Sequence, residues 1–100
     1  MQVFEITSDS TTVIRNQFAQ SGIVNYIRLT NAHTSGNVTI DLFLEDSSGK
    51  TYVVAKTEIP FNVTLLLDEH LSFSTGEFSL KLTTTSGTYG NNNGLTVIVG

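Results

Sequence analysis

The densest group of side chains able to bind a metal ion is Asp68, Glu69 and His70, three ligating residues in succession. On a strand, neighbouring residues point to opposite faces, so these three side chains would not converge on one ion. No second histidine lies at the spacing that a zinc site requires, and cysteine is absent. We therefore expect a solvated turn at 68–70, with no metal and no cofactor.

Groups that could act in catalysis are equally isolated. His33 lies in a polar stretch, and neither a cysteine nucleophile nor a Gly-x-Ser-x-Gly motif gives it a partner to activate. Asp41, Glu45 and Asp46 could supply a glycosidase-like carboxylate pair. However, Asp41 and Glu45 alternate with apolar residues, so we expect them on the solvent-exposed face of a strand. Because no acid, base or nucleophile set comes together, the sequence predicts a protein that is not an enzyme.

Composition limits the domain organisation and the partners. A chain of 100 residues has room for one hydrophobic core, so we expect a single domain over residues 1–100. Only 14% of the residues are charged, against about 25% in ordinary soluble domains. The net charge is -4 and Lys and Arg number five in all, too few for a phosphate-binding surface. We therefore expect no nucleic acid partner.

The apolar runs and the N-terminus bear on the compartment. The longest apolar runs, 65–67 and 97–99, are three residues long, whereas a membrane span needs about 20, so we expect no membrane partner. Residues 1–6 lack the basic start and the apolar stretch of a secretory signal. The absence of cysteine fits assembly in a reducing cytoplasm.

Apolar and polar residues alternate in the segments that must position these side chains. Every second position within 37–45 is apolar: Val38, Ile40, Leu42 and Leu44. Such spacing places the four side chains on one face of a strand. The segment ends at the turn 46–50, where Gly49 can adopt the positive φ that a hairpin needs. The same alternation recurs in 78–83 and 95–99.

This alternation, with turn signals about every 8–12 residues, predicts an all-β fold. We expect a single antiparallel β-sandwich, Ig-like or jelly-roll-like, of about seven to nine short strands. True antibody kinship is excluded by the absence of a Cys pair and of Trp. The expected strands are one around Phe4 and Ile6, then 11–18, 23–30, 37–45, 51–57, 63–67, 71–73, 78–83 and 95–99. The best helical candidate, 16–21, is one turn at most.

The apolar side of these strands gives the expected core. Its members are Phe4, Ile14, Ile27, Leu29, Ile40, Leu42, Leu80, Leu82 and Val97. We expect Phe18 to share a face with Ile14. In 51–57 the run Tyr52-Val53-Val54-Ala55 leaves the inward face ambiguous.

Three aromatic residues are candidates for a protein interface: Tyr26, Phe43 and Tyr89. Phe43 shares its face with Asp41, and Tyr26 shares its face with Arg28, so both are expected on the wet side, where an aromatic ring suggests contact with another chain. The alternative is that a neighbouring loop covers Phe43. Tyr89 lies in the polar loop 85–94, which could contact a sugar or a host surface or could simply be a solvated connection. The low charge favours assembly, and we expect a homo-oligomer.

Six segments between residues 25 and 99 follow a distinctive order. They are 37–46 followed by Ser-Ser-Gly, Tyr52-Val53-Val54-Ala55-Lys56, Ile59-Pro60, Thr64-Leu65-Leu66-Leu67-Asp68, Phe78-Ser79-Leu80-Lys81-Leu82 and Leu95-Thr96-Val97-Ile98-Val99. This order resembles that of small structural proteins of tailed bacteriophages. The chain departs from the resemblance at Phe61-Asn62-Val63, where those proteins tend to have a small-residue turn such as Ala-Gly-Ser.

The resemblance implies a virion component, either of the capsid decoration type or a neck or tail accessory. We expect a non-enzymatic protein that decorates or cements the capsid exterior through self-association and contact with the major capsid protein, in a virion assembled in the host cytoplasm. An acidic protein is repelled by packaged DNA, which favours an exterior position. The alternatives are a neck, tail or baseplate accessory that contacts neck or tail proteins, and a carbohydrate- or receptor-binding module.

Overall fold

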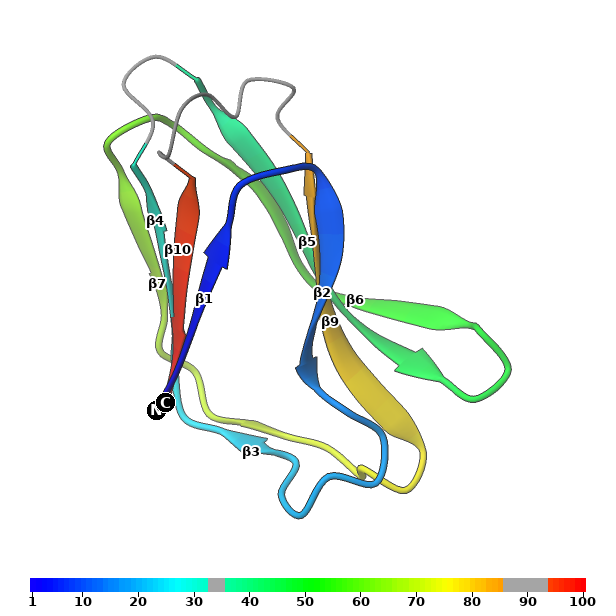
Figure 1. Ribbon diagram of the computed structural model, residues 1–100. Helices are drawn as coiled ribbons and strands as arrows, with labels where there is room; N and C mark the ends of the chain where they lie inside the picture. Colours follow the sequence, from blue (N-terminus) through cyan, green and yellow to red (C-terminus); the bar gives the residue numbers. More distant parts are fainter. Residues whose placement is uncertain (33–35, 86–93) are drawn as a thin grey trace.

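The computed structural model describes residues 1–32, 36–85 and 94–100, and all regular structure within them is β-strand. Two antiparallel four-stranded sheets pack together, and a short two-stranded pair lies below them (Figure 1). The predicted all-β antiparallel sandwich is therefore confirmed. The described residues form ten strands against the expected seven to nine, because the segment expected as one strand over 23–30 is divided into two.

The first sheet has the strand order β1-β10-β4-β7. Its strands are β1 (Gln2–Ile6), β10 (Leu95–Val99), β4 (Ile27–Asn31) and β7 (Thr64–Leu67). Gln2 pairs with Val99, so the two ends of the chain lie side by side (Figure 1). The N- and C-terminal strands are thus neighbours in one sheet, and β7 forms its far edge.

The second sheet has the order β2-β9-β5-β6. Its strands are β2 (Ser10–Arg15), β9 (Phe78–Thr85), β5 (Val38–Asp46) and β6 (Thr51–Ile59), while β3 (Ile23–Val24) and β8 (Leu71–Ser72) form the separate short pair. β5 pairs with β9 on one side and β6 on the other. Its alternation matches this central position, because Val38, Ile40 and Leu42 are at most 2% exposed.

The core fills the space between the two sheets. Every expected core residue is buried except Phe4, which is partly buried and packs against the core cluster. Asn31 is also fully buried, and its side-chain amide donates to the carbonyl oxygens of Gly36 and Ile59, both at 2.9 Å. Because Asn31 belongs to β4 and Ile59 to β6, this amide joins the two sheets and satisfies backbone acceptors that burial would otherwise leave unpaired.

Two expected segments differ from the structure. The strand expected over 11–18 ends at Arg15, and Phe18 does not share a face with Ile14: Ile14 is 3% exposed, Phe18 77%. The strand expected over 23–30 is divided at Asn25 and Tyr26. There Asn25 donates its N–H to the carbonyl of Gly100, and Gly100 donates its N–H to the carbonyl of Tyr26. Contact with the distant C-terminal residue therefore separates β3 from β4.

A β-bulge resolves the ambiguous face of 51–57. Leu42 pairs with Ala55 and Phe43 with Val53, which leaves Val54 as an extra residue in β6. The inward-facing positions are odd-numbered on one side of the bulge and even-numbered on the other, because the extra residue lies between Val53 and Ala55. A single alternation therefore cannot describe the whole segment.

The hairpin turn between β5 and β6 is organised by Asp46. One oxygen of its carboxylate accepts hydrogen bonds from the Ser48 hydroxyl, the Ser48 N–H and the Lys50 N–H, at 2.6 to 3.0 Å. Gly49 has the expected positive φ, 89°. The Ser48 hydroxyl, assisted by these backbone groups, lowers the pKa of Asp46 below its ordinary value.

The first prediction concerns the register of β5. Leu42 is 2% exposed and Thr39 faces the other side of the sheet, so Leu42→Ala should cost about 2–5 kcal/mol of unfolding free energy and Thr39→Ala much less. Urea unfolding midpoints of the two variants provide the measurement. Equal midpoints would mean that the inward and outward faces of β5 have been exchanged.

The second prediction concerns the pH dependence of the turn. Because the pKa of Asp46 is lower in the folded chain than in the unfolded chain, its contribution to stability is complete above the unfolded pKa and is lost as the pH falls through the folded pKa. Ser48→Ala should raise the pKa of Asp46 towards its ordinary value, as followed by an NMR titration of the carboxyl carbon. Ser47→Ala is the matched control and should leave the pKa of Asp46 unchanged.

Candidate interaction surfaces

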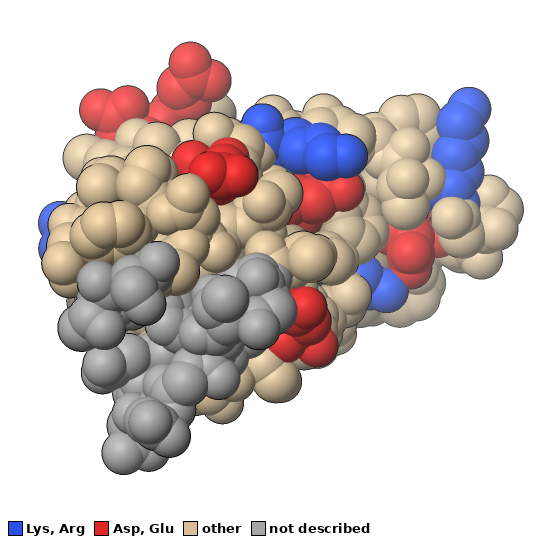
Figure 2. Space-filling view, turned by 90° about the horizontal axis from the view of Figure 1, so that it is seen from above, with Lys and Arg blue, Asp and Glu red and all other residues tan. Residues whose placement is uncertain are grey.

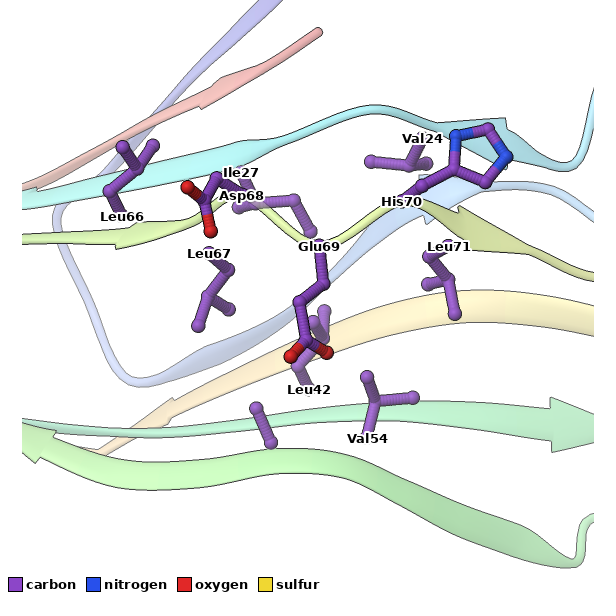
Figure 3. Close-up of a pocket in the computed structure, with 11 residues that line it drawn as sticks. Val24, Ile27, Leu42, Val54, Leu66, Leu67, Asp68, Glu69, His70 and Leu71 are labelled. Carbon is purple, nitrogen blue, oxygen red and sulfur yellow. The ribbon is translucent and has the colours of Figure 1, made fainter.

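The three ligating residues at 68–70 lie between β7 and β8, and all three are exposed. Their side chains diverge: Glu69 extends towards Leu42 and Val54, while Asp68 and His70 point to other sides (Figure 3). In the part of the chain that the structure describes, no three His, Cys, Asp or Glu side chains gather where they could hold a metal ion. The three side chains at 68–70 therefore do not converge on one point. His33 lies outside the described residues.

The candidate carboxylates are engaged in separate interactions. Glu45 forms an ion pair with Lys81 at 2.6 Å, and Asp46 is occupied by its own turn. Asp41 is half-buried on the outer face of the second sheet, with Lys56 and Thr83 as its cross-strand partners. Within the described residues one of its oxygens, Oδ1, is buried without a hydrogen bond. Glu45 and Asp46 thus have separate structural partners.

An apolar pocket of about 240 Å³ opens between β6 and β7, the edge strands that the two sheets leave on this side. Val24, Ile27, Leu42 and Leu71 contribute to its wall, and Glu69 extends across it (Figure 3). A site for a polar small molecule usually has several polar groups aimed at one point. Here Asp68 and His70 point elsewhere, so the pocket offers mainly apolar contact.

The structure describes two of the three aromatic residues expected at an interface. Phe43 lies on the outer face of the second sheet, where Val53 and Lys81 are its cross-strand partners, but only 9% of it is exposed. Tyr26 is half-buried against the C-terminus: a Cβ atom placed on Gly100 would lie 2.1 Å from its ring. Tyr89 lies outside the described residues. An interface at these three residues therefore stays a prediction.

Other large apolar side chains are exposed instead. They are Met1, Val3, Val13, Phe18, Ile23, Tyr52, Val53, Val54, Phe61, Val63 and Leu66. Only 14% of the residues are charged, and acidic and basic side chains are interspersed among uncharged ones when the molecule is viewed from above (Figure 2). The surface thus offers apolar and neutral polar groups for contact with other molecules.

The loop 16–21, which we name the Phe18 loop, presents the most exposed of these aromatic rings. Phe18 has a φ of 67° and is 77% exposed. Its N–H donates to the carbonyl of Thr75 at 2.6 Å, the Gln17 side chain donates to the carbonyl of Gly76, and the Thr75 hydroxyl donates to the carbonyl of Ala19. These bonds tie the loop to the turn before β9 and hold the strained residue in place.

Strand β6 is the second exposed feature that the sequence did not reveal. Seven of its nine residues are exposed, including Val53 at 62%, and among the described residues the strand pairs only with β5. The available signal was the ambiguous alternation around Val53 and Val54, since a strand with no dominant apolar face is typical of a sheet edge. For the Phe18 loop the sequence carried no such signal, because the apolar spacing from Ile14 favoured a buried ring.

Comparison with known proteins gives structural similarities but no sequence relative. No family model matches the chain, and no curated protein matches it. Solved structures that match include the one described as the structure of infectious bursal disease virus Gt strain, with 13% identity over 98% of this chain and 31% of the other, and a TM-score of 0.30. The chain spans about a third of that protein's length, and a similarity this low carries no functional argument. Among the described residues there is no helix with the length and apolarity to cross a membrane.

The third prediction follows from the divergent side chains at 68–70. His70→Ala should change the unfolding free energy by about 0.5 kcal/mol or less, because His70 is exposed. Elemental analysis should find no stoichiometric transition metal in either the parent protein or the variant. One tightly held metal ion per chain, lost in His70→Ala, would contradict the interpretation of this segment as a turn.

Proposed function

We propose that this chain is a non-enzymatic structural protein of a tailed-phage virion, which decorates or cements the capsid exterior through self-association and contact with the major capsid protein. The observation that supports it most directly is Phe18, an exposed ring on a loop whose backbone is held by hydrogen bonds. The ordered arrangement of segments that resembles phage structural proteins supplies the choice of virion.

Phe18 is costly to the isolated chain in two ways. A left-handed conformation costs a residue with a Cβ roughly 1–2 kcal/mol, and an exposed ring forgoes the roughly 1.5–3 kcal/mol that burial would provide. Backbone strain of this kind gathers where it serves function. Because hydrogen bonds already hold the backbone that carries the ring, the loop would lose little backbone entropy on binding, which suits an aromatic anchor at a protein interface.

The charge and surface composition support an exterior position. The chain carries a net charge of -4, so it is repelled by DNA phosphates and suits the outside of a filled capsid. Interface cores are depleted in charged residues and enriched in aromatic ones, in agreement with the exposed apolar side chains described above.

A neck, tail or baseplate accessory would use the same kind of surface, and the copy number in a virion separates the two positions. Hundreds of copies support capsid decoration, whereas about a dozen or fewer support a neck or tail role. A carbohydrate-binding module is less well supported. Tyr52 meets Phe78 edge to face, with ring centroids 5.8 Å apart, and the Lys50 ammonium lies 5.2 Å from the Tyr52 ring centroid, where a sugar would stack.

The fourth prediction tests Phe18 as the anchor. Phe18→Gly should leave the unfolding free energy within about 1 kcal/mol of the parent value, because glycine adopts a positive φ without strain, yet it should weaken co-sedimentation with capsids at least tenfold. Binding by the parent protein should persist to about 0.5 M salt, since apolar contacts are little screened.

Val3→Ser is the matched control, because Val3 is an exposed apolar residue on the other sheet. It should leave capsid binding unchanged. Full binding by Phe18→Gly, or loss of the complex by about 0.5 M salt, would contradict the proposed anchor.

A further inference from the structure

The exposed edge of the second sheet has a charge pattern that is complementary to itself. β6 forms this edge, and its main-chain groups on the side away from β5 have no strand partner among the described residues. Such an edge is a template for another strand. Within it, Lys56 and Glu58 lie two positions apart and so face the same side of the sheet.

We propose that β6 pairs with β6 of a second copy of this chain, antiparallel and about a two-fold axis at Thr57. In this register Lys56 of each copy lies opposite Glu58 of the other, which gives two ion pairs, and Ala55 lies opposite Ile59. The pairing joins the two four-stranded sheets into one continuous sheet across the dimer.

The charges select this register over its neighbours. A two-fold axis perpendicular to an antiparallel sheet passes midway between a residue and the same residue of the second copy, so this residue is paired with its own copy. An axis at Lys56 would oppose two ammonium groups, and an axis at Glu58 would oppose two carboxylates. Like charges directly opposite each other are destabilising in a sheet, so of these three the axis at Thr57 is favoured.

The surroundings of the two charged residues agree with this assignment. Lys56 makes no ion pair within the described residues, and its cross-strand partner is the half-buried Asp41. Oε1 of Glu58 accepts a hydrogen bond from the Asn37 amide at 2.8 Å, which orients the carboxylate and leaves its second oxygen for a lysine of the second copy. In the dimer Lys56 would lie between Asp41 of its own chain and Glu58 of the second copy.

Features next to this segment restrict which strands can pair with it. The bulge at Val54 and Pro60 limit regular pairing to 55–59, and a lysine on an edge discourages unselected partners. In the proposed dimer, Glu58 of the second copy neutralises the charge of Lys56. Exposed apolar residues lie just beyond each end of this segment, Val53 at 62% and Phe61 at 45% exposed.

This pairing assigns a surface to the self-association that the proposed function includes. The dimer itself does not depend on that function; only its use in a virion rests on it. Its test contains no capsid, so the two ideas can fail separately. Sedimentation velocity over a concentration series should show that the parent protein dimerises. Lys56→Glu should weaken the dimer at least tenfold, with a smaller defect at about 0.5 M salt because repulsion is screened.

The charge-exchanged variant, with Lys56→Glu and Glu58→Lys together, should recover dimerisation to within a few-fold of the parent. Lys50→Glu, the same charge change in the hairpin turn, should have no effect. A parent protein that stays monomeric, an unaffected Lys56→Glu dimer, or no recovery in the double variant would each overturn the assignment.

A cross-link tests the register without altering the charges. The chain has no cysteine, so Thr57→Cys introduces one thiol next to the proposed axis. Directly opposed residues in antiparallel strands have Cα atoms about 4.5–5.5 Å apart, within the range for a disulfide. Mild oxidation should give a disulfide-linked dimer of Thr57→Cys and not of the control Ser47→Cys. Equal cross-linking of the two variants, or none in Thr57→Cys, would exclude an axis at Thr57.

Discussion

The apolar layer between the two sheets is the interaction on which the rest of this structure depends. β5 lies inside the second sheet, and its residues Val38, Ile40 and Leu42 are buried. The chain has no cysteine, so no disulfide can support the fold, and burial of apolar side chains must offset the entropy of ordering the chain. A one-residue slip of β5 would move this layer to water, which is why its alternation is so strict.

The sandwich architecture also determines which surfaces of the chain are available for contact with other molecules. Two open sheets have four edge strands, and β6 is among the two longest elements yet mostly exposed. The Phe18 loop lies on the same framework and is fixed to the turn before β9 by hydrogen bonds. A rigid core that presents an edge and an aromatic loop is suited to assembly, because little order has to be gained on contact.

The polar groups that first suggested chemistry serve local structure instead. Asp46 builds a hairpin turn, Glu45 pairs with Lys81, and buried Asn31 joins the sheets. The exposed side chains at 68–70 point in different directions (Figure 3). Asp46, Glu45 and Asn31 therefore each stabilise a turn, a strand pair or the contact between the two sheets.

The sequence by itself determined the strands whose alternation is strict, the inward position of Leu42 and Leu80, the turn at Gly49 and the all-β class. These features follow from local geometry, since period-2 burial and positive φ are properties of a few consecutive residues. Only the tertiary structure decided that Gly100 divides 23–30, that Phe43 is covered, that Phe18 points outwards and that β6 lies at an edge. Each of these depends on a contact with a distant residue or on the order of strands in a sheet, and alternation within one segment does not specify which other segment will lie beside it.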